Sequence, residues 1–168
     1  MTCQFALRGA MIGLAAVALA NAGAASAVAP ARYRVTIGND LSRCAGAGPA
    51  VKVTVNGIKS AKGRIRVQLY RANDADWLEK GRWLHRIEAP ARAGSMTFCM
   101  PVPAAGSYGI AVRHDANANG KTDVSGDGGG MSNNPSINLL NLGKPNFRKV
   151  AIAVGGEVKS ISIQMRYL

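Results

Sequence analysis

Two neighbouring stretches decide the fold: Val51-Lys52-Val53-Thr54-Val55-Asn56 and Arg64-Ile65-Arg66-Val67-Gln68-Leu69. In both, every second residue is apolar, which is the period of a β-strand with one buried face. Gly57 and Gly63 bound the segment between them. We therefore expect a hairpin-like pair of strands whose outward faces carry basic and polar side chains.

The same alternation recurs along the chain. Further strands are expected at Tyr33–Ile37, Met96–Met100, Tyr108–Val112, Val150–Val154 and Val158–Tyr167. Gly155-Gly156 separates the last two and is a strong hairpin signal. Many short strands with little helix predict an all-β fold, a single antiparallel β-sandwich of about seven strands, either transthyretin/prealbumin-like or Ig-like.

The segment 73–94 breaks the strand rhythm. Asn73 or Asp74 suits the N-cap of a short helical excursion near 74–87. Trp77 and Trp83, the two tryptophans of the chain, lie in it. They form either an exposed platform for a sugar or peptide, or a cap on the core, and the second is favoured because tryptophan is mostly buried.

The first 27 residues have the pattern of a secretory signal peptide. Arg8 precedes an apolar run from Ala10 to Ala20, and Ala25-Ser26-Ala27 fits the cleavage rule. The run is shorter than the roughly 20 residues of a transmembrane anchor, and no second run of that length follows. We expect a signal peptide at 1–27, an arm at 28–49 and a β-sandwich domain at 50–168, in a periplasmic or secreted protein without a transmembrane segment.

An exported protein can keep disulfides. Cys3 would leave with the signal peptide, so Cys44 and Cys99 remain and are expected to pair. The bond would contribute at most about 4 kcal/mol in the chain-entropy model. Two separate buried thiols are the alternative.

The chain is basic. Its formal charge of +12 falls to +11 when Arg8, the one charged residue of the first 27, is removed. This favours anionic cell-envelope polymers such as polysaccharide or lipopolysaccharide as partners, although such a charge also serves solubility alone. Export and the scattered positions of the basic residues argue against nucleic acid.

A polar stretch, His114 to Asp123, follows the apolar run Tyr108–Val112 and opens a loop that extends to about Asn146. It resembles the start of a calcium loop, in which oxygens come from positions 1, 3, 5, 7 and 9 and Gly stands at position 6. The candidate ligands are Asp115, Asn117, Asn119, the Lys121 carbonyl, Asp123 and the late-placed Asp127. Because Gly126 stands where a bidentate Glu is needed, binding should be weak.

Two other interpretations of this stretch stay open. Asp, Asn and Gly also stabilise tight turns without any metal. His114, Asp115 and Asp127 could act as acid and base groups of an envelope-associated hydrolase, although no nucleophile stands at a recognisable spacing. Softer metals are disfavoured because His114 and His85 are the only histidines.

Several pieces in order resemble the bacterial domain-of-unknown-function family 2141. They are Gly63–Tyr70, Pro103–Val112, the pattern His114-Asp115-x-Asn117-x-Asn119-Gly120-Lys121-x-Asp123, Ser132-Asn133-Asn134 and Pro145-x-Phe147. The resemblance covers about residues 51–168 and implies an exported protein with one small β-domain and no assigned activity. Family members tend to carry Gly-x-Pro-x-Glu before Ser-Asn-Asn, whereas this chain has Gly126–Met131, so it lacks one candidate carboxylate.

The sequence thus supports a first hypothesis, a non-enzymatic exported binding or structural module with or without a weak calcium loop. A hydrolase at the loop 114–127 and an electrostatic binder of anionic polymers are the alternatives.

Overall fold

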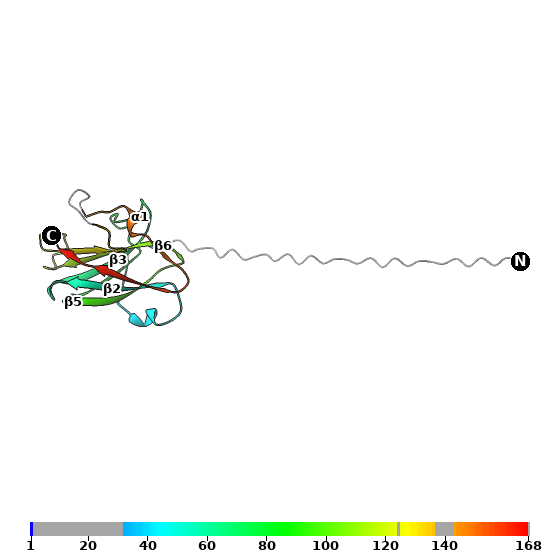
Figure 1. Ribbon diagram of the computed structural model, residues 1–168, viewed down its shortest axis with the longest axis horizontal. Helices are drawn as coiled ribbons and strands as arrows, with labels where there is room; N and C mark the ends of the chain where they lie inside the picture. The colour runs from blue at the N-terminus through cyan, green and yellow to red at the C-terminus, as the bar shows by residue number, and fades with distance from the viewer. Residues whose placement is uncertain (2–31, 124, 137–142, 168) are drawn as a thin grey trace.

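The computed structural model describes Met1 and residues 32–123, 125–136 and 143–167. The expected signal peptide beyond Met1 and the first residues of the arm lie outside the described residues. Within them, ten strands, a 3-10 helix and one short α-helix form a two-layered sandwich (Figure 1). The elements are β1 Val35–Ile37, η1 Leu41–Cys44, β2 Ala50–Ile58, β3 Arg64–Arg71, β4 His85–Pro90, β5 Gly94–Pro101, β6 Gly106–Asp115, β7 Gly128–Met131, α1 Phe147–Val150, β8 Ile152–Val154, β9 Val158–Gln164 and β10 Arg166–Tyr167.

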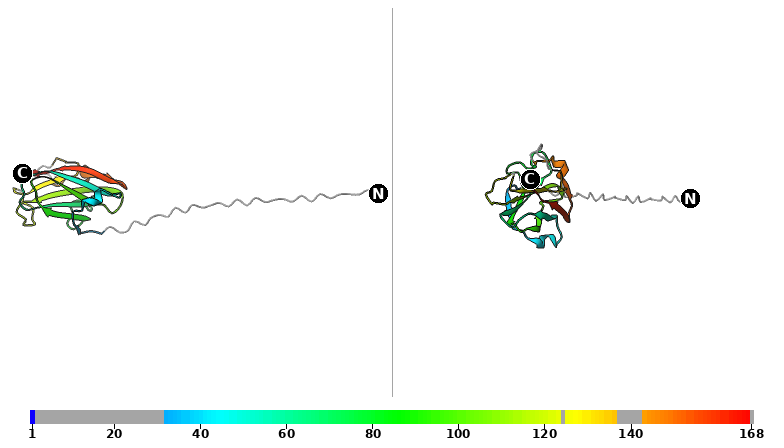
Figure 2. Two further views of the ribbon diagram at one scale, coloured as in Figure 1. Left: turned by 90° about the horizontal axis from the view of Figure 1, so that it is seen from below. Right: turned by 60° about the vertical axis from the view of Figure 1, so that its left-hand side comes forward.

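The large sheet has the order β1-β4-β3-β6-β7-β10, with β8 also paired to β6, and the small sheet has the order β5-β2-β9. Both contain parallel pairs, β1 with β4 and β2 with β9. The all-β sandwich predicted from the sequence is confirmed. It has ten described strands where about seven were predicted, and its sheets are mixed where an antiparallel arrangement was predicted. Figure 2 shows the layers from two other directions.

The core lies between the sheets. Val51, Val53 and Val55 of β2 face Ile65 and Val67 of β3, and all five are fully buried. Each contributes about 1.5–3 kcal/mol from removing its side chain from water. The alternation found in the sequence is therefore the cause of the two-layer architecture.

Two expected hairpins are absent. β2 and β3 lie in different sheets, and so do β8 and β9 on either side of Gly155-Gly156. Each turn carries the chain across the core instead of pairing neighbouring strands. Alternation fixes which face of a strand is buried and leaves its pairing partner open, so both layouts satisfy the same pattern.

The predicted helix near 74–87 is also wrong. Residues 74–78 form turns, and His85 already belongs to β4. Asn73 does act as a cap, since its side chain accepts from the Asp76 N–H at 2.9 Å. Leu78 then adopts a φ of 56°, which a right-handed helix cannot accommodate.

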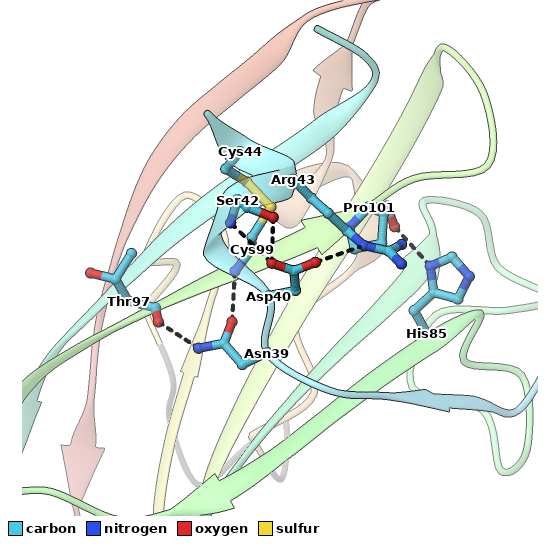
Figure 3. Close-up of a disulfide and its surroundings, with 9 residues drawn as sticks. All are labelled: Asn39, Asp40, Ser42, Arg43, Cys44, His85, Thr97, Cys99 and Pro101. Atoms are coloured by element: carbon cyan, nitrogen blue, oxygen red, sulfur yellow. Dashed lines mark hydrogen bonds and ion pairs between the residues drawn. A yellow bond between two sulfur atoms is a disulfide. The ribbon is translucent and has the colours of Figure 1, made fainter. Parts of the chain in front are cut away.

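The arm fastens one side of the sandwich. β1 extends the large sheet beside β4, and the chain then crosses to β5 at the edge of the small sheet. There Asn39 pairs with the β5 backbone, donating to the Thr97 carbonyl and accepting from the Cys99 N–H, both at 3.0 Å (Figure 3). The predicted disulfide between Cys44 and Cys99 is present, with 5.7 Å between the Cα atoms.

A second, smaller apolar cluster lies on the outer face of the large sheet. It consists of Tyr70, Trp77, Trp83 and Val150, with Phe147 packed against it. The tryptophans are 3% and 8% exposed, so they cap a core and do not form a platform. Segments 72–84 and 143–150 thereby cover the half of this outer face around Tyr70. We call the half that carries Arg64, Arg66 and Arg113 the open half, because in the described part of the chain this apolar cluster does not include those residues.

Candidate functional site

The loop after β6 has the side-chain-to-backbone bonds of a series of tight turns. Asp115 Oδ2 accepts from the Gly120 N–H at 2.9 Å, Asn117 Oδ1 from the Asn119 N–H at 3.1 Å, and Asn119 Oδ1 from the Lys121 N–H at 2.7 Å. Gly120 has a φ of 78°, which only glycine adopts without cost. The spacing noted in the sequence thus corresponds to a folded turn.

The two other carboxylates of the loop, those of Asp123 and Asp127, accept hydrogen bonds from groups within the loop. Asp127 Oδ1 accepts from the Ala116 N–H at 3.0 Å, and its Oδ2 accepts from the Asp123 N–H at 3.1 Å. Asp123 Oδ2 accepts from the side-chain amides of Asn117 and Asn119, each at 2.8 Å. These bonds join the two ends of the loop.

A cation already lies against this loop. The Arg113 guanidinium donates to Asp115 Oδ2 and to the Gly120 carbonyl, both at 3.1 Å, and to the Thr122 hydroxyl at 3.0 Å. Asp115 Oδ1 is buried and has no hydrogen-bond partner among the described residues. Arg113 therefore compensates part of the carboxylate charge that a metal ion would otherwise balance.

The candidate calcium ligands do not form a carboxylate-rich centre. Within the described ranges there is no group of three or more His, Cys, Asp or Glu side chains suited to a metal ion. Asp115, Asn117, Asn119 and Asp123 are gathered in one turn, whereas both Asp127 oxygens are taken up by backbone N–H groups. Calcium binding stays a prediction.

His114 faces the interior. It is fully buried, its Nδ1 lies 2.8 Å from Tyr167 Oη and its Nε2 lies 2.7 Å from the Lys62 carbonyl. A carbonyl only accepts, so Nε2 carries the proton, and Nδ1 accepts from the tyrosine hydroxyl, which itself accepts from the Lys59 N–H at 3.0 Å. Burial raises the pKa of Tyr167. The structure thus places His114 and Asp115 on opposite faces of β6, and it does not assemble the acid and base groups of a hydrolase.

The open half of the outer face is rich in arginine. Residues in register across five strands form a row on that face, which we call the arginine row. It consists of Glu88 on β4, Arg66 on β3, Arg113 on β6, Gly129 on β7 and Arg166 on β10. Five strand arginines occupy this face together: Arg64, Arg66, Arg86, Arg113 and Arg166. Among the described strand residues there, only Glu88 and Asp115 bear opposite charge.

The acidic partners are shared unequally. Arg66 bonds Glu88 at 2.7 Å, while Arg86 and Arg64 approach the same carboxylate at 3.6 and 3.8 Å. The Arg86 guanidinium stacks on the Trp83 ring at 4.0 Å. Burial, and then the charge of Arg66, lower the pKa of Arg86. Positive charge is therefore in excess at this surface.

One signal of this surface is visible in the sequence, namely the basic outward positions of the strand at 64–69. The register that places Arg113 and Arg166 in the same row could not be found, because it depends on β7, Gly128–Met131, which has no alternation in its sequence.

No curated protein and no solved structure matches the chain. A family described as "Uncharacterized protein conserved in bacteria", domain of unknown function 2141, matches residues 53–162. That range contains the Asp/Asn loop and every residue of the arginine row except Arg166. The chain belongs to domain-of-unknown-function family 2141.

Proposed function

We propose that this chain is an exported, non-enzymatic module that binds anionic groups of cell-envelope polymers on the open outer face of its large sheet. The observation that supports this proposal is the excess of arginine over carboxylate on that face. Arginine is suited to the role because its planar fork pairs with carboxylate and phosphate oxygens in two-point contacts.

The loop serves this function as a structural part. Arg113 bonds three groups of the loop, so the loop holds the arginine in place as much as the arginine holds the loop. A partly buried arginine with fixed hydrogen bonds, such as Arg113, loses less side-chain entropy on binding than a free one.

The experiment compares two double variants of equal charge change. Arg66→Gln with Arg166→Gln removes two charges from the arginine row, and Lys52→Gln with Lys159→Gln removes two charges elsewhere. Binding to an anionic polysaccharide, measured by calorimetry at several salt concentrations, should weaken roughly tenfold or more in the first variant only. Equal weakening in both would show that net charge alone is responsible, and the proposal would fail.

A weak calcium loop is the second candidate. It is favoured by the buried Asp115 Oδ1, a carboxylate oxygen without a partner among the described residues. Asp115, Asn117, Asn119, the Lys121 carbonyl and Asp123 would hold the ion, and Asp127 would have to release its backbone bonds to join them. Millimolar calcium should then raise the melting temperature of the protein, and the shift should vanish in Asp115→Ala and Asp123→Ala. An unchanged melting temperature at several millimolar would exclude this candidate.

A further inference from the structure

We propose that the arginine row is a site for a phosphate monoester group, seated over Gly129 between Arg113 and Arg166. This inference rests on the proposed function and names the chemistry of its ligand. Both arginines pair with Gly129 in the strand between them. Because neighbouring strands lie about 4.8 Å apart, their Cα atoms are separated by about 10 Å.

The space over Gly129 is open. A Cβ built on Gly129 meets no atom within 4 Å, whereas one on Gly128 would meet the Tyr167 ring and one on Gly130 would meet Ile163. The glycine at 128 is therefore explained by the Tyr167 ring of the neighbouring strand β10, and the glycine at 130 by the close approach of Ile163 from the small sheet. Packing does not explain why residue 129 is a glycine, since a Cβ there would meet no atom. Room for a ligand would explain it.

The inner face of the same strands shows how such a gap is used. There Gly128 lies between His114 and Tyr167, and these two side chains meet across it in a 2.8 Å hydrogen bond. On the outer face the flanking side chains are both guanidinium groups. Two cations cannot bond to each other. Arg113 already donates from both Nη groups to the loop, so an oxyanion over Gly129 would accept from Arg166 and from the one Nη1 N–H of Arg113 that the loop does not use.

The neighbouring arginines outnumber their carboxylates, because Arg64, Arg66 and Arg86 share Glu88 and only Arg113 is paired with Asp115. Arg66 lies directly opposite Arg113, and their side chains are only 21% and 18% exposed. Like charges that face one another across strands destabilise a sheet. The buried Nε atoms of Arg86 and Arg113 have no acceptor among the described residues. Local conflicts of this kind are expected where a site serves a function.

Charge and shape identify the class of ligand. A phosphate monoester carries about −1.5 to −2 at neutral pH, and its three terminal oxygens can accept from several guanidinium groups at once. A single carboxylate would leave more of the positive charge uncompensated. The row lies on a sheet face and small-molecule sites are usually concave, so we assign the phosphate to a group displayed on a polysaccharide.

The test uses three probes at equal ionic strength: a phosphorylated polysaccharide, a carboxylated polysaccharide of equal charge density, and inorganic phosphate. Calorimetry should give roughly tenfold tighter binding to the phosphorylated polymer than to the carboxylated one. Inorganic phosphate should compete only weakly. If it binds as tightly per site as the polymer does, free phosphate is the ligand and the assignment to a polymer is overturned.

Two variants test whether the phosphate group binds over Gly129. Arg166→Gln removes one flanking charge, and Gly129→Val fills the gap with a residue that favours strands. Both should weaken binding of the phosphorylated polymer by roughly tenfold, while Gly129→Val unfolds at the same urea concentration as the wild type. Lys52→Gln, on the far face of the small sheet, is the control and should bind normally.

The outcomes separate the two proposals. Equal affinity for both polymers with loss in Arg66→Gln/Arg166→Gln would overturn the phosphate assignment and leave the proposed function standing. Undiminished binding in Gly129→Val would likewise overturn the site over Gly129. Binding of both polymers that does not depend on any arginine of the row would overturn both.

Discussion

His114 illustrates how one residue takes a different role from the one its neighbours suggest. Its place beside Asp115 invites an acid-base interpretation, yet the alternation of a strand directs the two side chains to opposite faces. The imidazole instead connects the 59–62 segment to the last strand through Tyr167 and the Lys62 carbonyl. The residue is structural because all its polar atoms are already bonded in a buried setting.

Tyr167→Phe tests this network. It removes the hydroxyl that donates to His114 Nδ1 and accepts from the Lys59 N–H. We expect the free energy of unfolding to fall by about 1–3 kcal/mol, since two polar groups lose their partner. Urea unfolding measures it, with Tyr108→Phe as the control because that hydroxyl makes one bond, to the Ala104 carbonyl. A smaller loss at Tyr167 than at Tyr108 would contradict the account.

Some residues could be assigned from sequence and others could not. The cysteine pair followed from an even count outside the expected signal peptide, and the burial of the tryptophans followed from their size. The Asp/Asn loop was visible as a turn, but Arg113 was not recognised as its cation. That contact depends on a side chain from the preceding strand reaching forward over the loop, and spacing along the chain does not encode it.

β7 shows what a strand without side chains contributes. Gly128-Gly129-Gly130 lies between β6 and β10 and allows both a close approach of the sheets and an open floor on the outside. The sequence placed this segment in a long irregular loop, because glycine has low strand propensity and no period to detect. Its strand character comes from pairing with β6, a tertiary effect.

The three glycines should respond differently to alanine. Gly128→Ala and Gly130→Ala place a Cβ 2.4 Å from the Tyr167 ring and 2.7 Å from Ile163 Cγ2, so each should cost about 1–3 kcal/mol of unfolding free energy. Gly129→Ala meets open space and should be neutral or stabilising by about 0.5–1 kcal/mol. Chemical denaturation of the three variants checks the order. Equal losses at all three positions would show that strand pairing, and not packing, requires glycine.

The two expected hairpins that are absent show that strand pairing, like the strand character of β7, depends on tertiary contacts. Alternation correctly predicted that β2, β3, β8 and β9 are strands. It could not show that Gly57–Gly63 and Gly155-Gly156 are crossings between sheets, because a sandwich with crossings and one with hairpins bury the same faces. The helix predicted near 74–87 is absent for another reason: Leu78 has a positive φ, and the segment forms turns that place Trp77 and Trp83 in the outer cluster.

For the molecule as a whole, the arm and its disulfide join the two sheets at one side. β1 belongs to the large sheet, while Asn39 and Cys44 are bonded to β5 of the small sheet. Within the described part of the chain no helix is long and apolar enough to span a membrane. The disulfide thus adds a covalent link to the contacts that β1 and Asn39 make with the two sheets.

Removing the link should be costly. In Cys44→Ser/Cys99→Ser the cross-link between residues 55 positions apart is lost, and the free energy of unfolding should fall by up to about 4 kcal/mol. Thermal or urea unfolding measures it, with the reduced wild-type protein as the matched control. Unchanged stability would show that the arm is held by β1 and Asn39 without help from the disulfide.

On the scale of the molecule, we propose that the outer face of the large sheet binds phosphate groups on an anionic polymer. The most direct measurement is a titration of the isotope-labelled protein with a phosphorylated polysaccharide, followed by nuclear magnetic resonance of the backbone amides. The largest chemical-shift changes should fall on Arg66, Arg113, Gly129 and Arg166. Changes centred on Lys52 and the small sheet, with the arginine row unaffected, would contradict this proposal.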